Sequence, residues 1–484
     1  MRYFRNWLSL AGAVVALGSL FAFLLLMAID LFAAHSNPYL GILTYVIAPG
    51  FLLLGISLVL LGGWTQRRHL KKTAGLDLPG KLVIDLSRSR DRKVLGGFIC
   101  CSVVFLLLTA IGTNRSYHYS ESVQFCGLAC HGPMKPEYTA YLHSPHARVE
   151  CTACHVGPGA SAFVKAKING VHQLMGVVRG NYQRPIPTPI KNLRPAEETC
   201  EQCHWPEKFV GNLDRTFNHF LADETNTPFS VRLILKVGGG DLLHGQPGGI
   251  HWHMALANKV QYIATDEKRQ VIPWVRLTDQ SGTITEYRAP GFKDDPNKHV
   301  IRTMDCLDCH NRPAHRFISP NDAVDRAMEA GRIDRSLPWV KSNAVAVLTQ
   351  SYSTENEALE KISSGLRAKF SGALQVDSLV KEVQGIFKAS FFPEMKADWR
   401  SYPENLNHKD WAGCFRCHDG NHKTSDGKHS IQASDCNSCH TILAQGAGEQ
   451  FTKLNPKGHS FFHIDAVNED FNCNSCHTGA FPKQ

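Results

Sequence analysis

The sequence predicts a three-helix transmembrane anchor over residues 1–115, followed by a mainly helical and irregular domain that holds a strand-containing insert. Two observations support this prediction. Three uncharged apolar stretches lie within the first 115 residues, and seven short cysteine motifs that end in histidine run through the rest of the chain. These motifs use fourteen of the sixteen cysteines, so they decide how the second part can fold.

The anchor is predicted from stretches that are long enough to cross a hydrocarbon core of roughly 30 Å. They are Trp7–Ile29, Tyr39–Trp64 and Val94–Thr113. The first is longer than the apolar region of a typical signal peptide and ends without a clear A-x-A cleavage site. We therefore expect an uncleaved, multi-pass anchor.

Basic residues set the expected orientation. The loop at residues 65–93 carries nine Lys or Arg residues against three Asp, and such loops stay cytoplasmic. Three spans then place the chain after Thr113 in the periplasm or outside, on a bacterial inner membrane. With Arg2 and Arg5, the anchor holds most of the net charge of +9. The outer part is close to neutral, so the charge does not indicate nucleic-acid binding.

The cysteine motifs are typical of covalent haem attachment. Each offers two thiols that form thioethers to the haem vinyl groups, and a histidine that ligates the iron. Six are CxxCH and the first is a stretched CxxxCH; the cysteines are Cys126 and Cys130, Cys151 and Cys154, Cys200 and Cys203, Cys306 and Cys309, Cys414 and Cys417, Cys436 and Cys439, and Cys473 and Cys476, and the histidines are His131, His155, His204, His310, His418, His440 and His477. Zinc ribbons do not demand a histidine after each CxxC. The sequence therefore predicts seven covalently bound c-type haems.

The number of motifs limits the fold of the outer part. Residues 116–484 leave about 53 residues for each haem, which is too little chain for a separate apolar pocket around each one. We expect the haems to cover one another in a multihaem cytochrome c domain of short helices and long loops. Motif spacing divides it into a four-haem region at 116–316 with a strand-rich insert at 205–304, a helical spacer at 317–407, and a three-haem region at 408–484.

Side-chain periodicity supports the insert and the spacer. Strand-like runs occur at Ser230–Val237 and Val260–Thr265. In Asn321–Ser390, apolar residues recur at steps of three and four, which predicts helices with a break at Pro338.

Four segments of the outer part match a known pattern in order. They are CHGPMKPEYTAYLHSPHARVECTACHVGP (Cys130–Pro158) with the helix-like FVKAKINGVHQLMG that follows it, then CEQCH, and CLDCHNRPAH (Cys306–His315). They resemble the four haem sites of the NapC/NirT family of membrane-anchored multihaem quinol dehydrogenases, and in particular its seven-haem inner-membrane branch in metal-respiring bacteria. Three spans, the insert and the three-haem extension depart from the four-haem pattern, which leaves the electron acceptor open.

Fourteen outer histidines lie outside the motifs and could supply sixth iron ligands. The resemblance implies His146, in SPH before the second motif, and His315, in CHxxxxH. His422 sits similarly after the fifth motif, and His408, His429 and His459 each precede a motif. His251 and His253 would face one side of a strand and could clamp a haem, but we do not count them among the expected ligands. The remaining histidines are expected at the surface or near propionates: His143, His219, His244, His299 and His463.

The first haem is expected to differ from the others. Met134 lies three residues beyond His131, where the resemblance implies a methionine ligand, and a thioether would raise the potential. Alternatively, Met134 only packs on the ring edge. Lys165 and His172 are two helical turns apart and share a helix face. The family tends to place a lysine and then an acidic residue there, beside the first haem and the quinol. Here His172 could be a haem ligand or the base that takes the quinol proton.

The resemblance implies a quinol dehydrogenase that draws on the quinol pool of the membrane, with menaquinol or a similar quinol as substrate. Lys165 would orient a quinol oxygen, and periplasmic cytochromes or another redox complex would accept the electrons. One alternative is a relay subunit without a quinol site, which three spans favour because they could dock a membrane-protein partner. Another is a terminal reductase of nitrite or hydroxylamine, although such enzymes often carry a CxxCK motif and none occurs here.

Overall fold

The computed structural model describes residues 6–480 except 33–46, 73–85, 94, 98–99, 101–117, 120, 130, 158, 191–192, 239–248, 255–257, 433–435 and 464–472. These residues form two compact units. The first comprises residues 1–126 and 151–175, and the second comprises 127–150 and 176–484. The predicted span Val94–Thr113 lies almost entirely outside the described residues.

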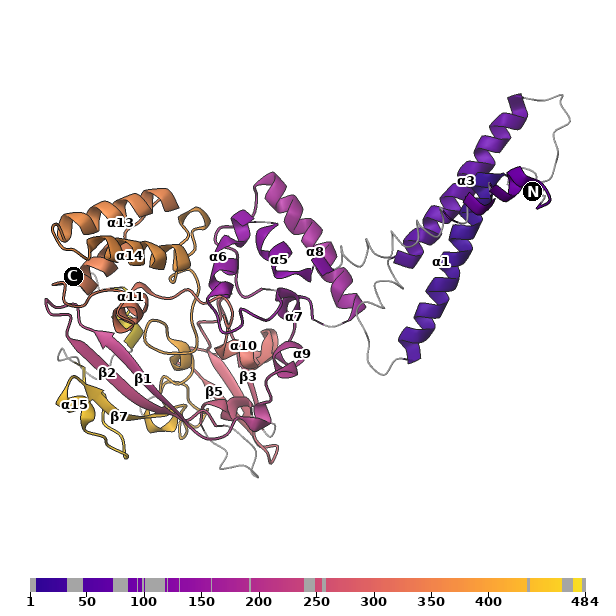
Figure 1. The fold of residues 1–484 in the computed structure, drawn as a ribbon. Coiled ribbons are helices and arrows are strands. Elements are labelled where there is room, and N and C mark those ends of the chain that lie inside the picture. The colour runs from indigo at the N-terminus through magenta and orange to yellow at the C-terminus, as the bar shows by residue number, and fades with distance from the viewer. Residues whose placement is uncertain are drawn as a thin grey trace. The chain divides into compact units, whose positions relative to one another are not determined.

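Two long apolar helices, α1 (Trp7–Phe32) and α3 (Ala48–Lys72), run side by side in the first unit (Figure 1). They are antiparallel: Asn6 donates to the Gly62 carbonyl (3.0 Å) at one end, and Ser19 donates to the Ala48 carbonyl at the other. Within the part of the chain that the structure describes, these are the two helices long and apolar enough to cross a membrane. The hairpin brings the start of α1 and the start of the basic loop, at Thr65, to the same end.

Small residues let the two helices approach closely. A Cβ atom on Gly12 would lie 2.6 Å from the Gly55 carbonyl oxygen, and one on Gly55 would lie 2.8 Å from the Gly12 oxygen. Large apolar side chains such as Leu17, Phe21 and Leu60 are exposed on the outside of the hairpin. Close packing through small residues, with apolar side chains turned outward, is the pattern of helices that associate in lipid.

The second unit contains two antiparallel sheets. The strands of the first are β1 (Leu213–Phe220), β2 (Pro228–Leu235) and β7 (His440–Gly446), in that order. The strands of the second are β5 (Ile284–Arg288), β4 (Trp274–Thr278), β3 (Lys259–Ile263) and β6 (Ile301–Thr303). β2 and β3 therefore lie on the two strand-like runs. β7 comes from the C-terminal region, so the insert and that region share a sheet.

Four helices follow in the spacer: α11 (Pro320–Glu329), α12 (Val340–Leu348), α13 (Glu355–Lys369) and α14 (Val376–Ser390). Ser319 and Thr354 cap α11 and α13 by accepting from backbone N–H groups of the first turn. The break expected at Pro338 separates α11 from α12. Apolar residues of these helices, including Val324, Ile362 and Phe387, form a buried core. The spacer thus has an apolar core of its own, which motif counting did not predict.

The other helical elements are short, and most of them carry or adjoin a cysteine motif. They are α5 (Val123–Leu128), α6 (His131–Leu142), α7 (Cys151–His155), α8 (Ala160–Arg179), α9 (Ala196–Thr199), η3 (Cys200–Gln202), η4 (Pro206–Lys208), η5 (Ile250–Met254), η6 (Pro296–Lys298), α10 (Cys306–Cys309), η7 (Pro393–Met395), η8 (Gly413–Arg416), η9 (Cys436–Ser438), α15 (Glu449–Thr452) and η10 (Cys473–Ser475). The α8 helix, at 20 residues, is the long one among them.

Candidate haem centres

Each motif from the second to the seventh forms a single helical turn. The turn closes when the histidine N–H donates to the carbonyl of the first cysteine, as in His204 to Cys200 (2.9 Å) and His310 to Cys306 (2.8 Å). This local bond fixes two thiols and an imidazole on one side of a short turn, which is the arrangement that haem attachment requires. In the first motif, Cys130 and the His131 side chain lie outside what the structure describes.

Among the described residues, five motif histidines face a second histidine from outside their own motif. The ring centroids are 6.2 Å apart for His146 and His204, 6.3 Å for His251 and His310, 5.8 Å for His253 and His418, 6.2 Å for His408 and His440, and 5.9 Å for His463 and His477. A ligating nitrogen lies about 2 Å from a metal and about 1 Å from its ring centroid, so two imidazoles on one metal have centroids roughly 6 Å apart. The spacing of all five pairs therefore fits one iron between two rings.

The hydrogen bonds of these rings favour the ligating tautomer. In two of the pairs, three rings have an Nδ1 atom that donates to a backbone carbonyl: His251 to Val237 (2.5 Å), His253 to Ile250 (2.9 Å) and His418 to Gln432 (3.2 Å). Nδ1 then carries the proton and Nε2 keeps its lone pair for a metal. His408 and His440 each have a buried Nδ1 with no hydrogen-bond partner among the described residues, which fits a site that is complete only with its cofactor.

For five of these rings, burial favours the neutral imidazole, which is the form that binds iron. It lowers the pKa of the following histidines: His310, His408, His418, His440 and His477. The residues present at five motifs thus fit bis-histidine haem sites in spacing. A lowered histidine pKa supports four of these sites, the fourth to the seventh, and a hydrogen-bonded Nδ1 supports the fourth and the fifth.

Neighbouring motifs are joined to one another. Burial, together with the adjacent Cys200 thiol, raises the pKa of Cys306 to about 11, and burial with the adjacent Cys414 raises that of Cys309 to about 11. Arg416 of the fifth motif donates to the backbone carbonyl of Asp308 in the fourth (2.9 Å). The third, fourth and fifth motifs therefore form a continuous series.

The Asp308 side chain holds the fourth motif in place. It is buried and accepts hydrogen bonds from Arg269 (3.0 Å), from the Tyr262 hydroxyl and from the Asp305 backbone N–H (2.9 Å). Asp305 in turn accepts from the Leu307 N–H (2.8 Å), so the two carboxylates form a capping box around the first turn of α10. A residue inside a haem motif thus also anchors the second sheet.

Two of the predicted sixth ligands, His146 and His408, lie beside motif histidines. His408 precedes the fifth motif in the sequence, but it faces His440 of the sixth motif. It also pairs three histidines that were not expected as ligands: His251, His253 and His463. His251 and His253 lie on η5 and not on a strand. For His463 the available signal was its position ten residues before Cys473.

The position of His422 contradicts the ligand role predicted for it. Its side chain is buried, with Nδ1 2.8 Å from the Asp419 carboxylate and Nε2 2.6 Å from the Ile272 carbonyl. Both partners accept hydrogen bonds, so both ring nitrogens donate and neither has a lone pair for iron. We therefore correct the prediction and leave His422 out of the ligand set.

His429 and His459 are also not placed beside a motif histidine in the described structure. His429 is exposed on the turn that starts at Thr424, and its backbone N–H donates to the Thr424 hydroxyl (3.2 Å). The His459 Nε2 lies 3.2 Å from the Lys453 carbonyl. These contacts give no support to the expected ligand roles.

The residues expected near the first two haems are placed as follows. A hydrogen bond with the Cys126 thiol raises the pKa of Cys151, so the first cysteines of the first and second motifs are adjacent. Met134 is half-buried on α6. The His315 Nδ1 donates to the Glu137 carbonyl (3.0 Å), and burial lowers the pKa of His315.

The α8 helix exposes the residues predicted to meet a quinol. Lys165 and His172 are both exposed, and Ile168 and Met175 are exposed on the same face, since the four residues recur at steps of three and four. The face therefore combines a cation, an imidazole and two apolar side chains.

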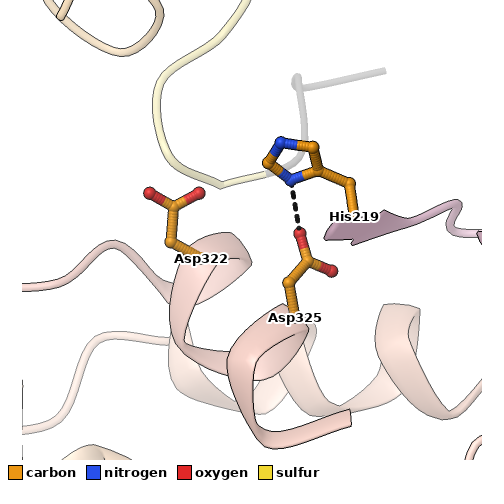
Figure 2. Close-up of side chains that lie close together, drawn as sticks. All are labelled: His219, Asp322 and Asp325. Carbon is orange, nitrogen blue, oxygen red and sulfur yellow. Dashed lines mark hydrogen bonds and ion pairs between the residues drawn. The ribbon is translucent and has the colours of Figure 1, made fainter. Parts of the chain in front are cut away.

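His219, Asp322 and Asp325 form a separate cluster with the composition of a metal site (Figure 2). Its carboxylates, however, are already paired with lysines. His219 donates to Asp325 (3.0 Å), and Asp322 lies beside them on α11. Lys341 bonds Asp325 (2.6 Å) and Lys409 bonds Asp322 (2.5 Å). Two ammonium groups already balance the two carboxylates, so a cation would have to displace them. We assign the cluster a structural role.

Comparison with known proteins supports the haem assignment. A family model described as the NapC/NirT cytochrome c family, N-terminal region, matches residues 88–186. The cytochrome c-type protein ImcH of Geobacter sulfurreducens is 39% identical over 500 aligned residues, which cover 99% of this chain and 96% of that protein. No solved structure matches the chain. The similarity to ImcH thus extends over almost the whole of both chains.

Proposed function

Because this chain belongs to the NapC/NirT family of c-type cytochromes, we propose that it is an inner-membrane cytochrome with seven haems that oxidises a quinol of the menaquinol type. Membership itself makes the chain a membrane-associated multihaem protein of electron transport. The proposal adds the substrate, the haem count and the direction: electrons leave for periplasmic or extracellular-directed acceptors in anaerobic respiration. Periplasmic cytochromes or another redox complex would serve as partners, and the apolar helices could dock a membrane protein.

The haem count is supported by the seven motifs and by the five histidine pairs. We assign the pairs at the third, sixth and seventh motifs as proximal and distal ligands of those haems. Met134, His172 and His315 then remain as candidates for the first two. When bound, each haem would carry one electron, and the chain would supply and position the ligands of its iron.

The donor side is supported by the exposed face of α8. A helix face that presents lysine and histidine among apolar side chains suits the boundary between water and lipid, where a quinol headgroup resides. In the proposal, the Lys165 ammonium donates to a quinol oxygen and the His172 imidazole accepts a proton from it. Both residues lie on the helix that follows the second motif, with Ala160 only five residues after His155. This proximity is the observation that carries the donor assignment.

The alternatives are less well supported. A terminal reductase needs an iron with an open position, yet all seven motifs end in histidine and five of these histidines face a second imidazole. A relay subunit would need no exposed donor face on α8.

The test is anaerobic mixing of the purified holoprotein, in detergent or nanodiscs, with a reduced menaquinone analogue. We expect haem reduction, seen as growth of the reduced α-band, without any partner protein. Full reduction by dithionite but none by the quinol would overturn the proposal and favour the relay alternative.

A further inference from the structure

The short helix η5 (Ile250–Met254) carries two histidines that face two different haem motifs. His251 stacks with His310 of the fourth motif, with ring planes 1° apart. His253 faces His418 of the fifth motif, with ring planes 85° apart. We propose that His251 and His253 are the sixth iron ligands of the fourth and fifth haems, so that one turn of the insert clamps both. This inference rests on the seven-haem cytochrome proposed above and deepens it.

The helical form of this segment explains how two neighbouring histidines reach two sites. A 3₁₀-helix has three residues per turn, so successive side chains point about 120° apart. His251, Trp252 and His253 therefore point in three directions, whereas a strand would have placed both histidines on one side. The Trp252 side chain packs against an apolar cluster on the second sheet, and this cluster contains Tyr262. The packing of Trp252 fixes the position of η5, and the His251 and His253 side chains on either side of it point toward different motifs.

Backbone bonds fix η5 before any ligand binds. The Ile250 N–H donates to the Lys236 carbonyl (2.7 Å), and the His251 N–H donates to the Gly238 carbonyl (3.2 Å). Gly249 has a φ of +90°, and a Cβ atom there would overlap the Lys236 oxygen. The turn is thus docked on the end of β2 at a position that only glycine allows.

The ring tautomers agree with this assignment. The Nδ1 atoms of His251 and His253 donate to the Val237 carbonyl (2.5 Å) and the Ile250 carbonyl (2.9 Å). In each ring Nδ1 therefore carries the proton and Nε2 keeps its lone pair, and the facing ring is in each case that of a motif histidine.

The two motifs are also bonded directly to each other, independently of η5. Arg416 donates to the Asp308 carbonyl (2.9 Å), which fastens the fifth motif to the fourth. Because the two motifs are adjacent, a single five-residue turn can supply a ligand to each of them. The insert thus ties the four-haem region to the three-haem extension, at the point where the four-haem pattern of the family ends.

The test compares His251→Ala and His253→Ala in the full-length holoprotein with His299→Ala, which changes an insert histidine that bonds Asp294 at the surface. Mass spectrometry counts the attached haems, and electron paramagnetic resonance of the oxidised protein reports their ligands. Each η5 variant should keep seven haems, convert one of them from low spin to high spin, and regain the low-spin signal when imidazole is added. The control should match the wild type.

The ring planes predict which signal each variant loses. Parallel imidazoles act on the same iron d orbital and give a rhombic low-spin signal, whereas perpendicular imidazoles act equally on two orbitals and give a highly anisotropic one. His251→Ala should therefore remove a rhombic signal, and His253→Ala a highly anisotropic one. A variant that keeps seven low-spin haems overturns the assignment for its haem.

If an alanine variant does not load its haems, the methionine variants decide the question. His251→Met and His253→Met keep a ligand, but a thioether raises the haem potential. One haem in each variant should titrate at a higher potential than in the wild type, and an unchanged redox titration overturns the assignment. None of these measurements uses quinol, so a failure here is distinct from a failure of the donor proposal.

Discussion

The Arg416 guanidinium donates a hydrogen bond of 2.9 Å to the backbone carbonyl of Asp308. A second nitrogen of the same guanidinium donates to the Arg269 carbonyl (2.9 Å). Arg416 occupies a position of the fifth motif that haem attachment leaves free, and Asp308 occupies the same kind of position in the fourth. The interior residues of one motif are therefore used to fix its neighbour.

Replacing this arginine should loosen the contact between the two motifs. Arg416→Met keeps much of the side-chain stem but removes all donors. The Arg269 and Gly413 carbonyls lose this donor, and the Asp308 carbonyl keeps only its bond from Asn405 (2.9 Å). We expect a loss of about 2 kcal/mol in the free energy of unfolding, measured as a lower denaturation midpoint of the holoprotein. Arg367→Met on the exposed side of α13 is the control and should change little. Equal losses in the two variants would contradict the role given to Arg416.

Gly413 should not tolerate a side chain. Its φ is +52°, and a Cβ atom would overlap the Asn407 carbonyl oxygen, next to His408. Gly413→Ala therefore pushes apart the start of the fifth motif and the partner of His440. We expect a lower ratio of haem to protein, measured by pyridine haemochrome against protein mass.

The matched control is Gly420→Ala, because Gly420 also has a positive φ (+73°) but open space around its Cβ position. That variant should lose only the backbone term of roughly 1–2 kcal/mol and keep its haems. If both variants load haem equally well, the close approach at Asn407 is not required.

The sequence predicted what depends on neighbours along the chain. A cysteine motif places its ligands within six residues, and the periodicity of Asn321–Ser390 records which side of each helix is buried. Sixth ligands depend instead on packing between distant segments. His422 has the spacing of a ligand, yet its position beside β4 and β5 turns it onto Asp419 and Ile272.

The pairing of β2 with β7 was equally hidden from the sequence. Leu235 faces His440, more than 200 residues along the chain, and no local pattern encodes that register. Backbone bonds to the residues after β2 hold η5 at the end of that strand. This position is what brings His251 and His253 to their partner histidines. Their sequence spacing suggested a strand, and only the long-range contact selects the helical turn.

The ion pair of Lys341 and Asp325 should be costly to break. Their charged atoms are 2.6 Å apart and both side chains are buried. Asp325→Asn leaves the Lys341 ammonium buried without its counter-charge, so we expect a loss of about 3–5 kcal/mol in unfolding free energy. Lys341→Met combined with Asp325→Asn removes both charges and should recover most of that loss.

The loss in Asp325→Asn should also depend on pH. Burial lowers the pKa of Lys341 below its ordinary value of 10.5, so the unfolded chain binds the proton more tightly than the folded one. Stability from this group therefore rises with pH between the folded and unfolded pKa values. The difference in denaturation midpoint between Asp325→Asn and the wild type should shrink as the pH approaches 10.5. A constant difference would mean that Asp325→Asn does not lower the pKa of Lys341 any further.

The α1–α3 hairpin predicts a cytoplasmic basic loop. Asn6 bonds the Gly62 carbonyl, so the start of α1 and the start of the 65–93 loop lie at one end of the hairpin. In a background with Cys100→Ala and Cys101→Ala, Thr73→Cys should react in intact spheroplasts only with a membrane-permeant reagent. Ser425→Cys, on an exposed turn of the haem-bearing part, should react with an impermeant one. Reaction of Thr73→Cys with the impermeant reagent would refute this orientation.

The exposed face of α8 gives the sharpest test of the donor site. Lys165→Gln removes a positive charge and its hydrogen bonds to a quinol oxygen but keeps much of the side-chain length. Reduction by quinol should slow by about 10-fold or more, in line with the loss of one charged hydrogen bond of 1.5–3 kcal/mol. Reduction by dithionite and the visible spectrum should not change. Lys361→Gln on α13, another exposed lysine, should leave both rates at the wild-type value.

His172→Ala separates the two roles open to this histidine. If His172 only accepts the quinol proton, the variant should resemble Lys165→Gln, with slow quinol-driven reduction and an unchanged spectrum. If His172 is an iron ligand, one haem should shift toward high spin, because its sixth position then opens. The two outcomes are read from the same sample by stopped-flow reduction and by the spectrum of the oxidised protein.

Quinol-driven reduction at the wild-type rate in both Lys165→Gln and His172→Ala would refute a quinol site on α8, because neither the charge nor the imidazole would then act on the quinol. Electrons would in that case enter through a partner protein.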